Sequence, residues 1–247
     1  MRILYNFFIF ITLLSLNKAE ASDVLESQVI LLMDFSTSYF EKPRMNKLQK
    51  NFEYFGKLLI SEDANSEAPI IVDVRPIGVD SAQGDSLCTF TVARKGSIKK
   101  NIGCDGGKTG PLCTSKKEAI KDFFARTCFN KIASKSAAKA TDISGALYTA
   151  SKIRLGDPKP YLVIFSDMDE YRGDLPLGNI NLEGFKVLIV CSNQRTGNDG
   201  NLCQDVAPGF WLPKFAEMGV DAREIKIVNE GVTNGWHRSQ EAKWLFE

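Results

Sequence analysis

The chain has 247 residues, of which 44% are hydrophobic and 25% are charged, a composition typical of a globular domain with a full hydrophobic core. Its 31 basic and 30 acidic residues give a net charge of +1. This balance argues against bulk electrostatic attraction to nucleic acid or to an anionic membrane as the basis of its function.

The first residues have the pattern of a secretory signal peptide. Arg2 precedes an apolar stretch over Ile3–Leu16, and Ala19-Glu20-Ala21 provides a small-x-small cleavage site. The apolar stretch is shorter than the roughly 20 residues that a membrane-spanning helix needs. We therefore expect residues 1–21 to be removed. This would leave one exported domain over residues 22–247, periplasmic or secreted, with no integral membrane segment.

After this segment, short apolar runs alternate with helical patterns, which predicts a mostly parallel sheet with crossover helices. The first strand, Val29–Met33, is continuously apolar, as expected of a strand that is buried on both faces. A helix over Met45–Ile60 follows, with apolar residues at helical spacing. Ile70–Val74 and Leu87–Ala93 then predict a hairpin, which would give the sheet one antiparallel edge strand.

The second half of the chain continues the alternation after a Gly- and Lys-rich loop over residues 95–114. Its predicted elements are helices over Ser115–Ala133, Asp142–Leu155 and Trp211–Met218, strands over Tyr161–Phe165, Phe185–Val190 and Arg223–Val228, and a terminal helix over Gly235–Phe246. Trp211, Trp236 and Trp244 are expected in the core. The whole pattern predicts one α/β domain with a doubly wound, six-stranded, mostly parallel sheet and helices on both faces.

All six cysteines follow the predicted signal peptide, and an even number of cysteines in an exported chain favours disulfides. No two of them have C-x-x-C spacing, which argues against zinc-ribbon and thioredoxin-like sites. The sequence does not choose among the possible pairings. Pairing of near neighbours would join Cys104 to Cys113 and Cys191 to Cys203, and would leave Cys88 for Cys128.

Polar residues that could bind a cation follow two of the predicted strands. Asp34, Ser36 and Ser38 form D-x-S-x-S directly after the first strand, and in extended chain alternate side chains point the same way. Asp167 follows the strand that ends at Phe165, and Thr141 precedes a predicted helix. Ligands of open α/β sheets bind at the carboxyl ends of the strands. If these two strands are neighbours, five oxygen donors from three loops face each other there.

The chemistry of this donor set is selective. Carboxylates and hydroxyls are hard ligands, and the absence of histidine and cysteine from the set favours Mg²⁺, Mn²⁺ or Ca²⁺ over zinc or copper. Two carboxylates and three neutral hydroxyls do not complete an octahedral shell. An open position would remain for water or for an acidic side chain of a partner protein.

In these motifs the chain resembles a von Willebrand factor type A (vWA) domain, the fold of integrin I domains, with its metal-ion-dependent adhesion site (MIDAS). The resemblance covers essentially all of residues 22–247. It implies a Rossmann-like fold with direct metal ligation by Ser36 and Ser38, and ligation by Asp34, Thr141 and Asp167 either directly or through water. One departure concerns the residue after the strand-end aspartate. It is usually glycine in the family, whereas Met168 follows Asp167 here.

Two alternatives remain beside a metal-dependent, non-catalytic protein-binding domain. Asp167-Met168-Asp169 also resembles the D-x-D motif of haloacid-dehalogenase-like phosphohydrolases, in which Asp167 would be the nucleophile and Asp169 the acid/base. That family normally opens its fold with this motif, and this interpretation leaves Asp34, Ser36 and Ser38 unexplained. The other alternative is a vWA scaffold whose metal site does not function.

Overall fold

The computed structural model describes most of the predicted domain. The described residues are 27–37, 45–60, 70–92, 128–134, 136–155, 159–170, 177–192, 203, 207–231 and 235–246. The predicted signal peptide, Ser38, the loop over residues 95–114 with Cys104 and Cys113, and most of the helix predicted over Ser115–Ala133 lie outside them. In the part of the chain that is described, no helix is both long and apolar enough to cross a bilayer.

The described residues form a six-stranded sheet in the order β3-β2-β1-β4-β5-β6. All neighbouring strands are parallel except β2 and β3, so β3 is the antiparallel edge strand that the sequence predicts. The strands are β1 (Ser27–Asp34), β2 (Ile70–Ile77), β3 (Cys88–Val92), β4 (Lys159–Ser166), β5 (Lys186–Cys191) and β6 (Ile225–Asn229). The predicted fold class is confirmed.

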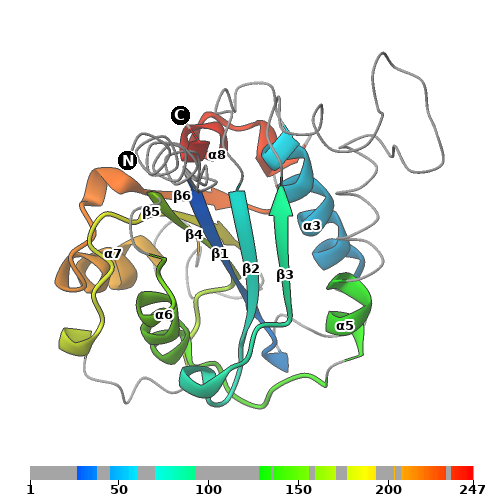
Figure 1. Ribbon diagram of the computed structural model, residues 1–247, viewed down its shortest axis with the longest axis horizontal. Coiled ribbons are helices and arrows are strands. Elements are labelled where there is room, and N and C mark those ends of the chain that lie inside the picture. Colours follow the sequence, from blue (N-terminus) through cyan, green and yellow to red (C-terminus); the bar gives the residue numbers. More distant parts are fainter. Residues whose placement is uncertain are drawn as a thin grey trace, which may run out of the picture.

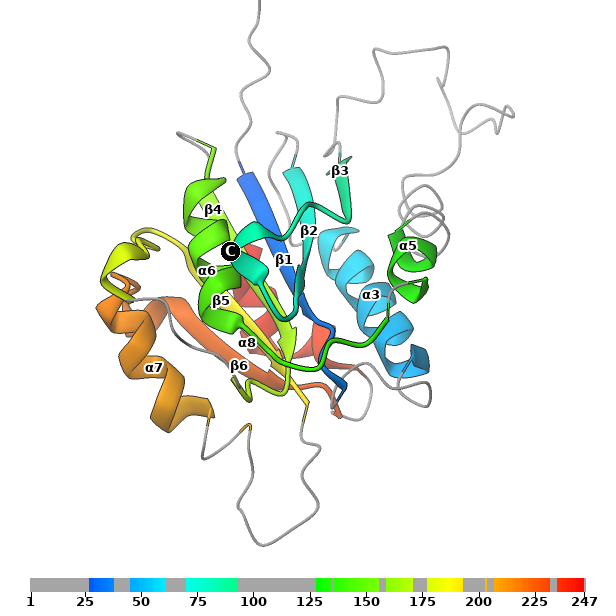
Figure 2. The ribbon, with the colours of Figure 1, turned by 90° about the horizontal axis from the view of Figure 1, so that it is seen from below.

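Helices cover both faces of this sheet (Figures 1 and 2). Strand β1 shows why, because its apolar side chains alternate between two separate core clusters. Val29, Leu31 and Met33 pack with the apolar stripe of α3, whereas Ile30 and Leu32 pack with α6 and α7. The helices are α3 (Met45–Ile60), α5 (Phe129–Ala133), α6 (Ile143–Lys152), α7 (Ala207–Glu217) and α8 (Gln240–Lys243).

Several predicted boundaries need correction. Strand β2 continues past Val74 through Pro76, because its pairing with β3 ends at Val74 and the missing N–H of Pro76 costs no bond on that side. Helix α7 begins at Ala207 rather than Trp211. Pro208 does not prevent this earlier start, because the N–H that it lacks would have no acceptor in the first turn of a helix. Helix α6 ends at Lys152, three residues before its predicted end.

The single terminal helix predicted over Gly235–Phe246 is wrong. This segment contains a 3-10 turn, η8 (Trp236–Arg238), the short α8, and a second 3-10 turn, η9 (Trp244–Phe246). Gly235 has a φ of 86°, and Ser239 caps α8 by accepting a hydrogen bond from the Ala242 N–H (3.1 Å). Tertiary packing therefore overrides the helical periodicity of the tail.

Two of the three predicted disulfides fall within the described residues, and both are confirmed. Cys88 at the start of β3 pairs with Cys128, and Cys191 at the end of β5 pairs with Cys203, with Cα–Cα distances of 5.7 Å and 5.5 Å. The pairing of Cys104 with Cys113 remains a prediction. Paired cysteines are typical of chains that fold in an oxidising compartment.

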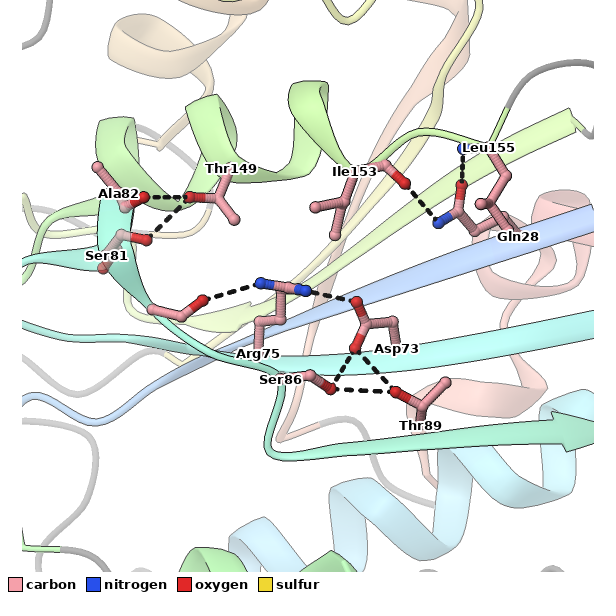
Figure 3. A network of polar contacts seen from close by, with 11 residues as sticks. Gln28, Asp73, Arg75, Ser81, Ala82, Ser86, Thr89, Thr149, Ile153 and Leu155 are labelled. Carbon is pink, nitrogen blue, oxygen red and sulfur yellow. Dashed lines mark hydrogen bonds and ion pairs between the residues drawn. The ribbon is translucent and has the colours of Figure 1, made fainter.

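A polar network fixes α6 against the sheet (Figure 3). The Gln28 side chain on β1 binds the end of α6 twice, donating to the Ile153 carbonyl (3.1 Å) and accepting from the Leu155 N–H (2.9 Å). Near the middle of the helix, the Thr149 hydroxyl donates to the carbonyls of Ser81 and Ala82 in the 3-10 turn η2 (Ser81–Gln83). The helix whose first turn follows Thr141 is thus held along its length.

Candidate metal site at the carboxyl edge of the sheet

Two aspartates come together where β1 and β4 end. The strands are paired in parallel with Met33 opposite Phe165, so Asp34 lies across from Ser166. The Ser166 hydroxyl donates a hydrogen bond of 2.6 Å to Asp34 Oδ2. Asp34 is fully buried, and Asp167, the next residue after Ser166, is 4% exposed. The two strands are therefore neighbours, which is the condition on which the predicted shared site depended.

The charge on these two residues is costly in the absence of a cation. Burial, followed by the negative charge of Asp167, raises the pKa of Asp34 to about 7. Hydrogen bonds from Ser166 and from the backbone and side chain of Ser36 act in the opposite direction but do not compensate. A cation bound between the carboxylates would favour their ionised forms.

Ser36 belongs to a loop that backbone bonds hold in place. Its N–H donates to Asp34 Oδ1 (2.7 Å), which turns the chain at the end of β1. Ser36 also forms an isolated parallel bridge with Ala138, and the Ala138 N–H donates to the Phe35 carbonyl (2.7 Å). The segment that leads to Thr141 therefore runs alongside the segment that follows Asp34.

Thr141 is 4% exposed and directly precedes the cap of α6. Asp142, which the sequence places inside this helix, is its N-cap. Its carboxylate accepts from the Gly145 N–H (2.7 Å) and from the Ser81 N–H (2.9 Å), while its own N–H donates to the Gly78 carbonyl (2.8 Å). Burial raises the pKa of Asp142, and the bonds from Gly145 and Ser81 oppose that shift. These contacts fix the Thr141 loop against the turn after β2.

Gly145→Ala is expected to destabilise the protein by about 1–2 kcal/mol, although alanine is the better helix former. A Cβ at this position would collide with the Asp142 carboxylate, so the cap would have to move. Urea unfolding measures the difference. Gly178→Ala is the matched control, since a Cβ added there would meet nothing within 4 Å, and it should change stability by less than about 0.5 kcal/mol. Equal effects of the two substitutions would contradict the steric argument.

The loop after β4 is tied to elements that the sequence does not connect with it. Trp211 Nε1, on α7, donates to the Met168 carbonyl (2.8 Å). Glu170 accepts from the Ser144 N–H at the start of α6 (2.7 Å) and pairs with Lys214 on α7 (3.1 Å). Sequence reasoning missed Ser166, Trp211 and Glu170. Only Ser166 had a signal, since it is a hydroxyl residue at the end of a strand beside Asp34.

Four of the five predicted ligands can be located, and Ser38 lies outside the described residues. Asp34, Ser36 and Asp167 meet at the β1–β4 edge, and the Thr141 loop adjoins them. No group of three or more His, Cys, Asp or Glu side chains that could hold a metal occurs among the described residues. A site here would thus have two carboxylates and depend on hydroxyls for its other protein ligands, which suits a hard cation that keeps some of its waters.

The geometry of Asp169 bears on the phosphohydrolase alternative. Asp167 is buried, whereas Asp169 is exposed and its backbone N–H donates to Asp167 Oδ1 (3.2 Å). The two carboxylates of this D-x-D motif therefore occupy different environments. The buried one lies beside Asp34.

Comparison with known proteins finds similarity among solved structures alone. No protein-family profile and no curated protein matches the chain. Proximal thread matrix protein 1 from the mussel byssus, in a structure with a zinc-occupied MIDAS motif, is 14% identical over 90% of this chain and 46% of its own (TM-score 0.46). A von Willebrand factor type A protein from Catenulispora acidiphila is 11% identical over 90% of this chain and 43% of its own (TM-score 0.47). The PilB minor pilin from Streptococcus sanguinis is 10% identical over 90% of this chain and 60% of its own (TM-score 0.48). The chain spans less than two thirds of each.

The arrangement of the sheet identifies the fold. Five parallel strands and an antiparallel edge strand, in the order β3-β2-β1-β4-β5-β6 and with helices on both faces, form the doubly wound architecture that the motif resemblance implies. The chain has a von Willebrand factor type A-like fold.

Proposed function

We propose that the chain is an exported, non-catalytic binding domain that holds a divalent cation, Mg²⁺ above all, and uses it to bind a protein partner. The proposed ligands are Asp34, Ser36, Ser38, Thr141 and Asp167. One observation carries the proposal. Two buried carboxylates from the ends of neighbouring parallel strands lie close enough that Asp167 raises the pKa of Asp34.

A bound cation would account for two carboxylates being buried next to each other. Two like charges in a buried place destabilise the folded protein, and a bound cation converts this repulsion into attraction. The oxygen donors favour Mg²⁺, Mn²⁺ or Ca²⁺. Because the protein supplies only two carboxylates, the cation would keep an exchangeable position. An acidic side chain of a partner is the natural group to occupy it.

Export is part of the same proposal. It is supported by the predicted signal peptide and by the disulfides Cys88–Cys128 and Cys191–Cys203, since such bonds persist in oxidising compartments. The balanced charge agrees with recognition through one defined site rather than through a broad charged surface.

Metal binding is tested by thermal unfolding with and without Mg²⁺ or Mn²⁺. A cation at 100 times its Kd stabilises the folded protein by about 2.7 kcal/mol, which corresponds to a rise in Tm of several degrees. Asp167→Asn should abolish the rise, and Asp169→Asn, in the same loop but exposed, should keep it. A wild-type Tm that is unchanged by Mg²⁺ and by Mn²⁺ would contradict the proposal. If the wild-type protein hydrolysed a phosphomonoester and both Asp167→Asn and Asp169→Asn lost that activity, the result would instead support the phosphohydrolase alternative.

The partner chemistry is tested with a displayed library of random peptides, selected against the folded protein in Mg²⁺ and again in chelator. We expect the Mg²⁺ selection to enrich peptides with a shared Asp or Glu, and these peptides to be released by chelator. Peptides that bind Asp167→Asn as well as they bind the wild-type protein would show that recognition does not use the cation.

A further inference from the structure

Met168, directly after Asp167, has an unusual backbone. Its φ is 60°, and among the described residues it is the only non-glycine residue with a positive φ. The left-handed region costs a residue with a Cβ about 1–2 kcal/mol. Strain of this kind persists where the surrounding structure holds it, and it is concentrated at functional sites.

Hydrogen bonds hold the peptide groups on both sides of Met168. Its N–H donates to Ser166 Oγ (2.9 Å), and its carbonyl accepts from Trp211 Nε1 (2.8 Å). Met168 is 5% exposed, and its side chain packs in the core cluster that contains α6 and α7. Trp211 is fully buried in the same cluster. Burial of the methionine and the indole bond together offset the cost of the backbone conformation.

The turn at Met168 fixes both candidate carboxylates. It brings the Asp169 N–H back to Asp167 Oδ1 (3.2 Å). The Ser166 hydroxyl that accepts from Met168 N–H also donates to Asp34 Oδ2 (2.6 Å). One continuous series of hydrogen bonds therefore runs from the Trp211 indole through the Met168 turn and Ser166 to Asp34.

Helix α7 holds this loop at a second point. Lys214, one helical turn after Trp211, pairs with Glu170 (3.1 Å), and Glu170 also accepts from the Ser144 N–H on α6. The loop is thus fixed to α7 on one side and to α6 on the other. Local sequence patterns do not predict these contacts, because Trp211 is 43 residues from Met168.

We propose that Met168 is a positioning residue of the metal site. Its left-handed turn, held by the Trp211 indole, orients the Asp167 carboxylate and, through Ser166, that of Asp34. The inference rests on the proposed metal function. It assigns to Met168 and Trp211, neither of which is a metal ligand, control over the geometry of two ligands.

A double-mutant cycle of Met168→Gly and Trp211→Phe tests this proposal. Two quantities are measured: Mn²⁺ affinity by calorimetry, and hydrogen exchange of the Asp169 amide in metal-free protein, which reports its bond to Asp167 Oδ1. We expect Trp211→Phe alone to weaken Mn²⁺ binding about tenfold, which is about 1.4 kcal/mol, and to accelerate Asp169 exchange by a similar factor. In the Met168→Gly background the same substitution should change either quantity by less than about threefold, because glycine adopts a φ of 60° without strain.

Trp236→Phe is the matched control. Trp236 is also fully buried and donates its indole N–H, to Asn51 Oδ1 (3.0 Å), but it lies in the core cluster on the other face of the sheet. It should lower stability about as much as Trp211→Phe and leave Mn²⁺ affinity and Asp169 exchange unchanged. The proposal would be overturned if Trp211→Phe weakened Mn²⁺ binding equally in the wild-type and Met168→Gly proteins. It would also be overturned if Trp211→Phe alone left the exchange of the Asp169 amide unchanged. Failure of the wild-type protein to bind Mn²⁺ while the exchange pattern holds would overturn the metal function and leave the role of the turn standing.

Discussion

Metal-free Asp34→Asn is expected to be more stable than the metal-free wild-type protein above neutral pH, by about 4 kcal/mol. The pKa of Asp34 rises from 3.8 to about 7 in the folded protein, so the fold binds a proton that the unfolded chain has released. Wild-type stability should therefore fall as pH rises from about 4 to 7 and then level off. Asparagine carries no charge, and it can still accept from the Ser36 N–H.

Urea unfolding from pH 4 to 8 in the presence of chelator measures this difference. The stabilities of Asp34→Asn and wild type should be closest near pH 4 and should separate as pH rises. Asp169→Asn serves as the control and should follow the wild-type curve, since Asp169 is exposed. Saturating Mg²⁺ should recover stability in the wild-type protein at pH 8 and not in Asp34→Asn, because the cation needs the carboxylate. A wild-type stability that does not fall between pH 4 and 7 would contradict the assigned cost of burying this charge.

The candidate ligands could be predicted because their signals are local. Asp34 and Asp167 each follow an apolar run that indicates a buried strand, and parallel strands bring their carboxyl ends to one edge. Ser36 follows from the alternation of extended chain. The register that sets Asp34 beside Ser166 is a property of strand pairing, so the bridging role of that hydroxyl could not be predicted from the sequence.

The residues that shape the loop after β4 could not be predicted, since they come from distant elements. The sequence shows that methionine stands where glycine is usual in vWA domains, but not that Met168 keeps a left-handed backbone. That conformation depends on Trp211 and on burial in a core formed by α6 and α7. The tail after β6 differs from its prediction for a similar reason. Its periodicity indicates a helix, and burial of Trp236 and the cap at Ser239 produce short turns instead.

The tail nevertheless belongs to the core, and its tryptophans allow a direct test. Trp236→Ala is expected to destabilise the protein by about 4 kcal/mol. The Trp236 ring is fully buried and lies edge-on to Phe165 of β4 (5.8 Å between centroids) and to Tyr54 of α3 (6.5 Å). Removal of its indole would also leave the buried Asn51 Oδ1 without this donor.

Trp244→Ala, eight residues later in the same tail, should cost only about 1 kcal/mol. Trp244 is partly exposed, and its ring lies close to the ammonium groups of Lys186 and Lys226, which are 4.7 Å and 5.2 Å from the ring centroid. Long charged side chains over a half-buried ring contribute modestly, because water replaces much of what is lost. The urea midpoints of the two variants measure this difference. A much larger loss of stability in Trp236→Ala would show that the tail is anchored to the sheet at Trp236, whereas equal losses in the two variants would contradict this.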